Sequence, residues 1–327
     1  MDPLVSIVIP SYNQGAFLEQ AVLSVLEQTY AHIELLVIDG ASSDESISIL
    51  KRYSDRITYW VSEPDRGQTD AINKGFHRAQ GEYLWWLNSD DELLLDSITS
   101  TVQYLKSNPD VDLVYGDLIW MDEAGSFLQN YHYAPFDFPA NIKNWVDISQ
   151  AGALARHEAL RSIGYLDESL HYLMDRDLWI RLALNGSQIR YLPQPLARFR
   201  VYAQSKTQAG SPQAAVERYE TTRTALQHPY FEGHPAAQRS AWARTHAASA
   251  RVYMKCGEYG LSLREVLRTF RSSPAAFFSS DVLTALFWSL PGLLLGRNRI
   301  TRLRQVIRAA RFHRGKDTDL EDAEGVQ

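Results

Sequence analysis

Short apolar runs alternate with amphipathic segments along the first 120 residues. The apolar runs at 5–9, 33–38, 57–61, 83–87 and 111–115 have the length and composition of buried strands. Apolar residues at three- and four-residue spacing predict helices near 15–28, 44–54, 68–80 and 92–107. This alternation indicates an α/β fold with a doubly wound, mostly parallel sheet.

The pattern becomes less regular beyond residue 145. It predicts short helices around 156–163 and 176–185, and strands at 188–192 and 196–201. Residues 204–235 are polar and rich in Gln, Thr and Ala, which indicates a connector. The sequence that follows predicts a C-terminal helical extension.

Polar, turn-forming residues follow each of the first four predicted strands. They are 10–13 (Pro-Ser-Tyr-Asn), 39–44 (Asp-Gly-Ala-Ser-Ser-Asp), 63–68 (Glu-Pro-Asp-Arg-Gly-Gln) and 88–91 (Asn-Ser-Asp-Asp). Some polar residues in or near these clusters have an ordinary structural explanation. Asp44 is expected to cap the next helix, and Asp70 or Asp96 could cap a helix as well. Ligands of doubly wound sheets bind beyond the carboxyl ends of the strands, so four such clusters predict a ligand site at one edge.

Composition and charge narrow the class of protein. The chain has 327 residues, 45% hydrophobic and 22% charged, which allows one large domain or a core domain with an extension. A formal net charge of −6 argues against nucleic acid as the main partner. The single cysteine, Cys256, cannot form an internal disulfide. Residues 1–4 pass directly into the first predicted strand, and no secretory signal is visible. Together these features predict a reducing, cytoplasmic setting.

The C-terminal region has a distinct charge pattern. Residues 275–296 are mostly apolar but are interrupted by Asp281 and by Pro291-Gly292, which argues against a membrane span. Residues 297–316 carry seven Arg and one Lys with no acid, and an acidic tail at 317–327 is predicted to be disordered. Two interpretations remain for 275–316: a basic amphipathic segment on an anionic leaflet, or a helix packed on the core with a solvated Arg face.

Five motifs occur in a fixed order along the chain. They are 6–13 (Ser-Ile-Val-Ile-Pro-Ser-Tyr-Asn), 37–44 (Val-Ile-Asp-Gly-Ala-Ser-Ser-Asp), 88–91, 164–168 (Gly-Tyr-Leu-Asp-Glu) and 175–181 (Asp-Arg-Asp-Leu-Trp-Ile-Arg). In these motifs the chain resembles family 2 glycosyltransferases of the GT-A fold, over residues 4 to 206. The resemblance implies a nucleotide-sugar-binding catalytic domain at 1–206, a helical extension at 207–316 and the tail at 317–327.

A nucleotide-sugar donor needs a pocket for its base and ribose. The resemblance assigns Asp39 to the ring N–H of a uracil-type base. Pro10, Ser11 and Tyr12 would line the same pocket, and Arg66 would reach the base or a phosphate. Without the flanking motifs, Tyr12 is equally well a half-buried packing residue, and Arg66 is a surface arginine.

Asp90 and Asp91 are the predicted metal ligands, because a leaving diphosphate requires positive charge and hard oxygen ligands suit Mg²⁺ or Mn²⁺. In the family's Asp-x-Asp pattern the first acid contacts the ribose or sugar, and here Asn88 takes its place. A neutral amide still bonds hydroxyls but is a weaker metal ligand, so the metal is assigned to Asp90, with Asp91 as second ligand or support. The alternative for the pair is a helix cap.

Asp175 is the predicted catalytic base, because it matches the second acid of the family's acidic pair. Met174 occupies the place where Glu is frequent, and Asp177 is the competing candidate. An inverting displacement needs a carboxylate beside the acceptor hydroxyl, opposite the leaving diphosphate. A purely structural N-cap is the alternative for Asp175.

The sequence thus predicts an inverting, metal-dependent glycosyltransferase that moves one sugar from a nucleotide-sugar, of the UDP type, to a glycan or lipid-linked acceptor in cell-surface polysaccharide assembly. The Gln-x-x-Arg-Trp motif of processive members is not seen after 175–181. A catalytically inactive nucleotide-sugar-binding module is the alternative, supported by Asn88 and Met174. A nicotinamide-dependent dehydrogenase is rejected because the turn at 10–13 has no Gly-x-Gly-x-x-Gly. The predicted location is the cytoplasm, peripheral at the inner face of the plasma membrane.

Overall fold

The computed structural model describes residues 2–136, 148–296 and 299. The acidic tail at 317–327 and nearly all of the basic stretch at 297–316 lie outside the described residues. The chain divides into two compact units, Met1–Ala209 with Glu220–His234 and Gly210–Tyr219 with Pro235–Gln327. Residues 220–234, which the sequence predicts as part of the helical extension, therefore belong to the first unit.

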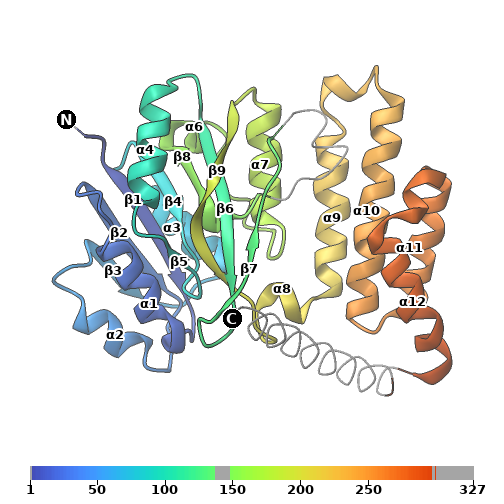
Figure 1. Cartoon of the computed structure of the whole chain (residues 1–327), viewed down its shortest axis with the longest axis horizontal. Helices are drawn as coiled ribbons and strands as arrows, with labels where there is room; N and C mark the ends of the chain where they lie inside the picture. The colour runs from blue at the N-terminus through green and yellow to red at the C-terminus, as the bar shows by residue number, and fades with distance from the viewer. Residues whose placement is uncertain (1, 137–147, 297–298, 300–327) are drawn as a thin grey trace, which may run out of the picture. The chain divides into compact units, whose positions relative to one another are not determined.

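Within the described residues a nine-stranded sheet forms the centre of the first unit, and its N-terminal part is parallel (Figure 1). The parallel strands, in the order β3-β2-β1-β4, are Tyr59–Ser62, Ile33–Asp39, Val5–Ser11 and Tyr83–Trp86. The register pairs Ser11 of β1 with Asp39 of β2, and Val8 of β1 with Trp86 of β4. The carboxyl ends of these strands therefore lie along one edge of the sheet.

Helices cover both faces of the parallel strands. They are α1 (Gly15–Leu26), α2 (Ser46–Arg52) and α3 (Gln68–Arg78), which agree with the predicted segments. Every residue of β1 is buried, as expected for a parallel strand covered on both sides. Leu18 and Val22 of α1 share one apolar cluster with Ile9, whereas Phe76 of α3 shares the other with Val8.

The rest of the sheet is mixed. The strands are β5 (Glu92–Leu93), β6 (Leu113–Met121), β7 (Phe127–Tyr131), β8 (Ala153–Arg156) and β9 (Ile189–Arg200). β8 runs antiparallel between β4 and β6, and β9 runs parallel to β6. The α/β class is confirmed: β1 to β4 form one parallel group, β6 and β9 form a second parallel pair, and β8 lies antiparallel between the two. The strand predicted at 111–115 does not pair with β4, because β8 from the less regular part of the chain inserts between them.

Short helical elements complete the first unit. They are α4 (Ser97–Ser107), η1 (Gln150–Gly152), α6 (His157–Ser162), α7 (Met174–Leu184), α8 (Lys206–Ala209) and η2 (Pro229–Phe231). The helix predicted at 92–107 begins only at Ser97, because Glu92 and Leu93 pair with β9. The two strands predicted at 188–192 and 196–201 form the single strand β9.

The second unit is helical. It contains the start of α9 (Pro212–Ala225), then α10 (Pro235–Lys255), α11 (Tyr259–Ser272), η3 (Pro274–Phe278) and α12 (Ser280–Leu295). Ala250, Val266 and Ala285 belong to the buried cluster that joins α10, α11 and α12. No helix among the described residues is long and apolar enough to cross a membrane.

Gly75 permits the close packing of α3 on β1, and Gly75→Ala tests it. The added Cβ would lie 2.3 Å from Cγ1 of Val8, whose strand is buried on both faces. We expect the free energy of unfolding to fall by about 1–3 kcal/mol in urea denaturation. Gly233→Ala is the control, because its Cβ meets no described atom within 4 Å, and a change within about 0.5 kcal/mol is expected. Equal stabilities of the two variants would contradict this packing argument.

Candidate active site

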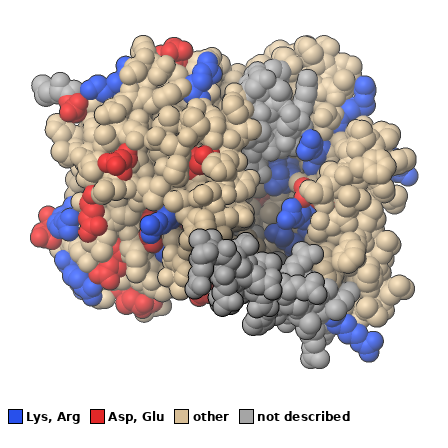
Figure 2. Space-filling model, in the orientation of Figure 1, with Lys and Arg blue, Asp and Glu red and all other residues tan. Residues whose placement is uncertain are grey.

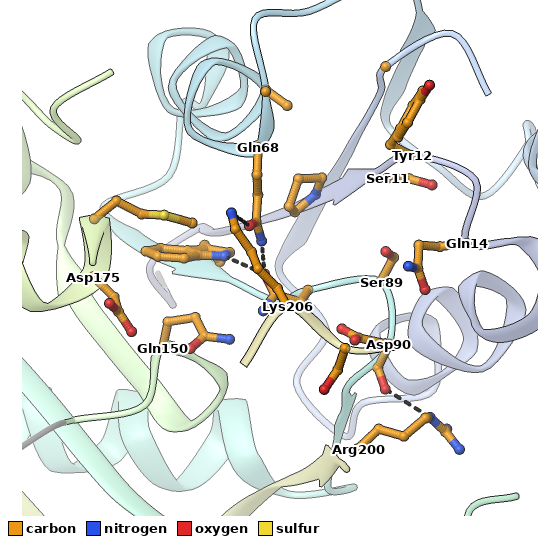
Figure 3. A pocket seen from close by; sticks show the side chains of 18 of the residues that line it. Ser11, Tyr12, Gln14, Gln68, Ser89, Asp90, Gln150, Asp175, Arg200 and Lys206 are labelled. Atoms are coloured by element: carbon orange, nitrogen blue, oxygen red, sulfur yellow. Dashed lines mark hydrogen bonds between the residues drawn. The ribbon is translucent and has the colours of Figure 1, made fainter. Parts of the chain in front are cut away.

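A cavity of about 750 Å³ opens where β1, β2 and β4 end (Figure 3). The start of α7 and the segment after β9 complete its walls. Six of the predicted site residues line it: Pro10, Ser11, Tyr12, Asn88, Asp90 and Asp175. The other three, Asp39, Arg66 and Asp91, do not line it.

The end of β1 forms a wall of the cavity with an exposed ring. Tyr12 is 62% exposed and its neighbour Ser11 is buried, with an Oγ that has no hydrogen-bond partner among the described residues. A Cβ on Gly40 would meet Oδ2 of Asp65 at 2.5 Å and the ring of Tyr12 at 3.3 Å. The glycine therefore lets the loops after β1, β2 and β3 approach one another.

Asp39, at the end of β2, is fully buried behind this wall. Its carboxylate accepts hydrogen bonds from N and Oγ of Ser42 at 2.8 and 2.5 Å, and from Oγ of Ser62 at 2.7 Å. These three donors fix the carboxylate and tie the loops after β2 and β3 together.

Arg66 lies on the surface. Its side chain is 73% exposed, and the guanidinium pairs with Asp70 at 2.8 Å and with Glu168 at 2.5 Å. Glu168 comes from the 164–168 motif, so Arg66 connects that motif to the start of α3.

Asn88 is held in one orientation by its neighbours. Its Oδ1 accepts from Nε1 of Trp86 at 2.9 Å and from Nε2 of Gln68 at 2.8 Å, while Oε1 of Gln68 accepts from Nζ of Lys206 at 3.0 Å. The indole N–H of Trp86 and the ammonium group of Lys206 can only donate hydrogen bonds. They therefore fix which side-chain atoms of Asn88 and Gln68 act as acceptors. The Nδ2 of Asn88 is left as a hydrogen-bond donor at the cavity, which suits hydroxyl or phosphate oxygens and not a cation.

Asp90 presents its carboxylate to the cavity. Oδ2 accepts a hydrogen bond from Oη of Tyr202 at 3.0 Å, and the backbone carbonyl accepts from Nε of Arg200 at 3.0 Å. The guanidinium of Arg200 also pairs with Glu92 at 2.8 Å and stacks over Phe17. The end of β9 thus fixes the backbone that carries Asp90 (Figure 3).

Asp91 lies behind Asp90 and is fully buried. Its Oδ1 accepts from the backbone N–H of Arg200 at 3.1 Å, and Nε2 of Gln150 approaches Oδ2 at 3.5 Å. Burial raises the pKa of Asp90, an effect that the bond from Tyr202 partly offsets. Burial, and then the charge of Asp90, raises the pKa of Asp91 well above its ordinary value.

The donor set at the cavity fits a divalent cation that shares its coordination with a substrate. The Asp90 carboxylate faces the cavity, and Tyr202 donates a hydrogen bond to it. Among the residues that the structure describes, no group of three or more His, Cys, Asp or Glu could hold a metal by itself. Mg²⁺ in phosphate-processing sites is often held by one carboxylate together with substrate phosphates. Asp90 can supply that ligand, whereas the Asp91 carboxylate is already held by Arg200 and does not reach the cavity.

Asp175 faces the cavity from the start of α7 (Figure 3). The helix begins at Met174 with Leu173 as its N-cap residue, so Asp175 lies in the first turn and is not the cap. Its Oδ1 accepts the N–H of the next residue, Arg176, at 2.7 Å. A carboxylate among helix N–H groups is favoured in its charged form.

The competing candidate, Asp177, points elsewhere. It is buried, its Oδ2 accepts from Nε of Arg181 at 2.6 Å, and it does not line the cavity. Burial raises its pKa, and Arg181 counteracts part of that increase. Of the two acids in the motif, Asp175 lines this cavity and Asp177 does not.

Other cavity residues were not singled out from the sequence. Gln14, Gln150, Tyr172, Tyr202 and Lys206 all line the cavity. Tyr202 follows β9, and its hydroxyl donates to the Asp90 carboxylate at 3.0 Å. Gln150, Tyr172 and Lys206 lie outside the five motifs, and only the folding of distant segments brings them to the cavity.

Comparisons with known proteins establish the family. The model of "Glycosyl transferase family 2" matches residues 6–164. An uncharacterized glycosyltransferase of Rickettsia typhi is 32% identical over 226 residues, which make up 67% of this chain and 70% of that protein. The chain belongs to glycosyltransferase family 2.

Solved structures share the fold at low sequence identity. TarS 1-349 of S. aureus in complex with UDP-GlcNAc matches with a TM-score of 0.59 and 14% identity, over 84% of this chain and 90% of that chain. The mannosyltransferase PcManGT of Pyrobaculum calidifontis, in complex with GDP-Man and Mn²⁺, matches with a TM-score of 0.55 and 18% identity, over 90% and 88% of the two chains. These likenesses confirm the GT-A type of fold.

The burial of Asp91 predicts a pH dependence of stability. Because its pKa is raised in the folded state, the native protein holds this proton more tightly than the unfolded chain, and stability falls as the pH rises from the ordinary value through the raised one. In Asp91→Asn the amide oxygen can still accept from Arg200, but the side chain no longer titrates. We therefore expect the free energy of unfolding to fall less between about pH 4 and pH 8 in this variant than in the wild type. Urea denaturation across this range measures it. An unchanged pH slope would contradict the argument.

Proposed function

We propose that this glycosyltransferase moves a single sugar from a nucleotide-sugar donor, of the UDP type, to an acceptor hydroxyl with inversion. The observation that carries the proposal is that Asp90 and Asp175 line one cavity, although 85 residues of sequence separate them. One carboxylate is suited to the leaving diphosphate and the other to the incoming hydroxyl. A glycan or lipid-linked acceptor of cell-surface polysaccharide assembly remains the prediction from the sequence.

The wall at the end of β1 is the proposed nucleotide site. The exposed ring of Tyr12 offers a surface for the base, and Ser11 has a buried Oγ without a partner among the described residues. The complexes of TarS with UDP-GlcNAc and of PcManGT with GDP-Man support a donor of this chemistry. For Asp39 to accept a base N–H, the base would replace the hydroxyl of Ser42 at its carboxylate.

Asp90 is the residue that would hold Mg²⁺ or Mn²⁺ together with the diphosphate of the donor. When bound, the cation supplies the positive charge that a leaving diphosphate needs. The bond from Tyr202 and the clamp from Arg200 hold Asp90 in place before the donor arrives. Asn88 would donate from Nδ2 to a sugar hydroxyl or a phosphate oxygen.

Asp175 would accept the proton of the acceptor hydroxyl. As that oxygen bonds to the anomeric carbon, the bond from this carbon to the diphosphate oxygen breaks, and the proton passes to the carboxylate. General-base assistance of this kind contributes about 10²- to 10⁴-fold to a rate. The alternative, an inactive nucleotide-sugar-binding module, predicts donor binding without turnover.

Asp175→Asn tests the proposed base. We expect the release of UDP from UDP-GlcNAc, measured with candidate acceptors and with water, to fall by at least about 10²-fold. Donor-induced thermal stabilisation should persist, because Asp175 is not a proposed donor ligand. Asp177→Asn is the matched control from the same helical turn, and it should retain turnover. Loss of turnover in Asp177→Asn but not in Asp175→Asn would assign the base to Asp177. A wild-type protein that binds the donor but never releases UDP would favour the inactive module.

Asp90→Asn tests the metal-dependent part of donor binding. For the wild-type protein, UDP-GlcNAc at about 100 times its Kd should add about 2.7 kcal/mol to the free energy of unfolding, and Mn²⁺ should strengthen this binding. The variant should lose the increment that depends on Mn²⁺. Asp91→Asn is the control and should keep it, because Asp91 does not line the cavity. If Mn²⁺ increases the stabilisation by UDP-GlcNAc as much in Asp90→Asn as in the wild type, Asp90 is not the metal ligand.

A further inference from the structure

Helix α12 exposes a row of large apolar side chains. Leu283, Phe287, Leu290 and Leu294 recur at helical spacing, and their exposed fractions are 48%, 66%, 54% and 87%. We call these four residues the α12 face. Exposed apolar surface of this extent on a helix marks an interaction site more often than a solvated surface.

The opposite side of α12 packs through small residues. Ala285, Ser289 and Gly292 are buried, and a Cβ on Gly292 would meet the ring of Tyr259 at 2.5 Å. The Oγ of Ser289 donates to Oγ of Ser262 on α11 at 2.9 Å. Val282 is also buried on this side, and Trp288 packs against the same cluster. The helix therefore has an apolar packed side and, in the α12 face, a second apolar surface that is exposed, whereas a helix that serves only a core has one apolar side.

Aromatic residues extend the apolar surface beyond the N-terminus of α12. Phe278, two residues before the helix, is 75% exposed, and its ring contacts that of Phe277. Phe277 in turn contacts Phe270 of α11, which is 51% exposed. Phe and Leu side chains are typical of the apolar face of segments that lie in the interface of a membrane.

The sequence that contains and follows α12 is rich in basic residues. From residue 259 to residue 316 the sequence has eleven Arg and Lys residues but only two acids, Glu265 and Asp281. Both acids are already paired, Glu265 with Arg268 and Asp281 with Arg251, each at 2.7 Å. In Figure 2 the visible surface of this unit is largely tan with blue side chains and little red.

We propose that the α12 face docks on an anionic lipid surface, with its apolar side chains in the headgroup boundary. Apolar area and basic charge next to each other are what anionic leaflets bind. A second copy of the chain is a poorer occupant, because this part of the sequence has an excess of Arg and Lys, and a symmetric interface would bring two such excesses together. The proposal does not depend on the identity of the donor.

Vesicle co-sedimentation of the full chain tests the proposal. We expect binding to vesicles of phosphatidylcholine with phosphatidylglycerol, weaker binding to phosphatidylcholine alone, and release by added salt. Phe287→Glu should lower the apparent partition coefficient by about tenfold or more. Phe127→Glu on β7 is the matched control, because Phe127 and Phe287 are 65% and 66% exposed, and it should bind as the wild type does.

Three outcomes would overturn the docking proposal. In the first, the wild-type protein does not bind anionic vesicles. In the second, Phe287→Glu binds them as well as the wild type does. In the third, the wild type is a dimer and Phe287→Glu is a monomer, and neither protein binds vesicles. Light scattering detects the last case. Thermal unfolding with and without UDP-GlcNAc shows that each variant is folded, and it separates a failure of docking from a failure of donor binding.

Discussion

The site depends on the burial of the parallel strands on both faces. Along β1 every side chain is buried, and β4 is likewise buried along its length. Unpaired polar groups are costly in such an interior, so the polar side chains that bind ligands collect where the strands end. Because β1, β2 and β4 are parallel neighbours, these ends meet at one edge, and the cavity lies there.

The two acids after β4, Asp90 and Asp91, make different contacts. Asp91 turns inward and accepts the backbone N–H of Arg200, which ties the end of β4 to the end of β9. Asp90 remains at the cavity, with its carbonyl held by the same arginine. The buried carboxylate is a structural clamp, and its raised pKa is the consequence of that position. The neighbouring Asp90 keeps its place at the cavity because this clamp holds the loop.

The two units of the chain carry different kinds of surface. The first unit gathers carboxylate, amide and hydroxyl groups in one cavity. The second unit packs with small residues and leaves Leu and Phe side chains of α12 outside. A lipid-linked acceptor would require an enzyme that works at a membrane surface, so the proposed function and the proposed docking are compatible, although each rests on its own observations.

Sequence alone determined the strand and helix alternation of the first 120 residues, the strand-end motifs and the family, because these are local patterns of burial and turn chemistry. It also predicted Tyr12, Asn88, Asp90 and Asp175, which all line the cavity. Tertiary structure decided which of two adjacent acids faces the cavity, since the partner of Asp91 lies 109 residues away in sequence. It also decided the insertion of β8 beside β4, the arrival of Lys206 at the cavity and the outward side of α12. Each of these depends on contacts between distant segments, and a local pattern cannot encode them.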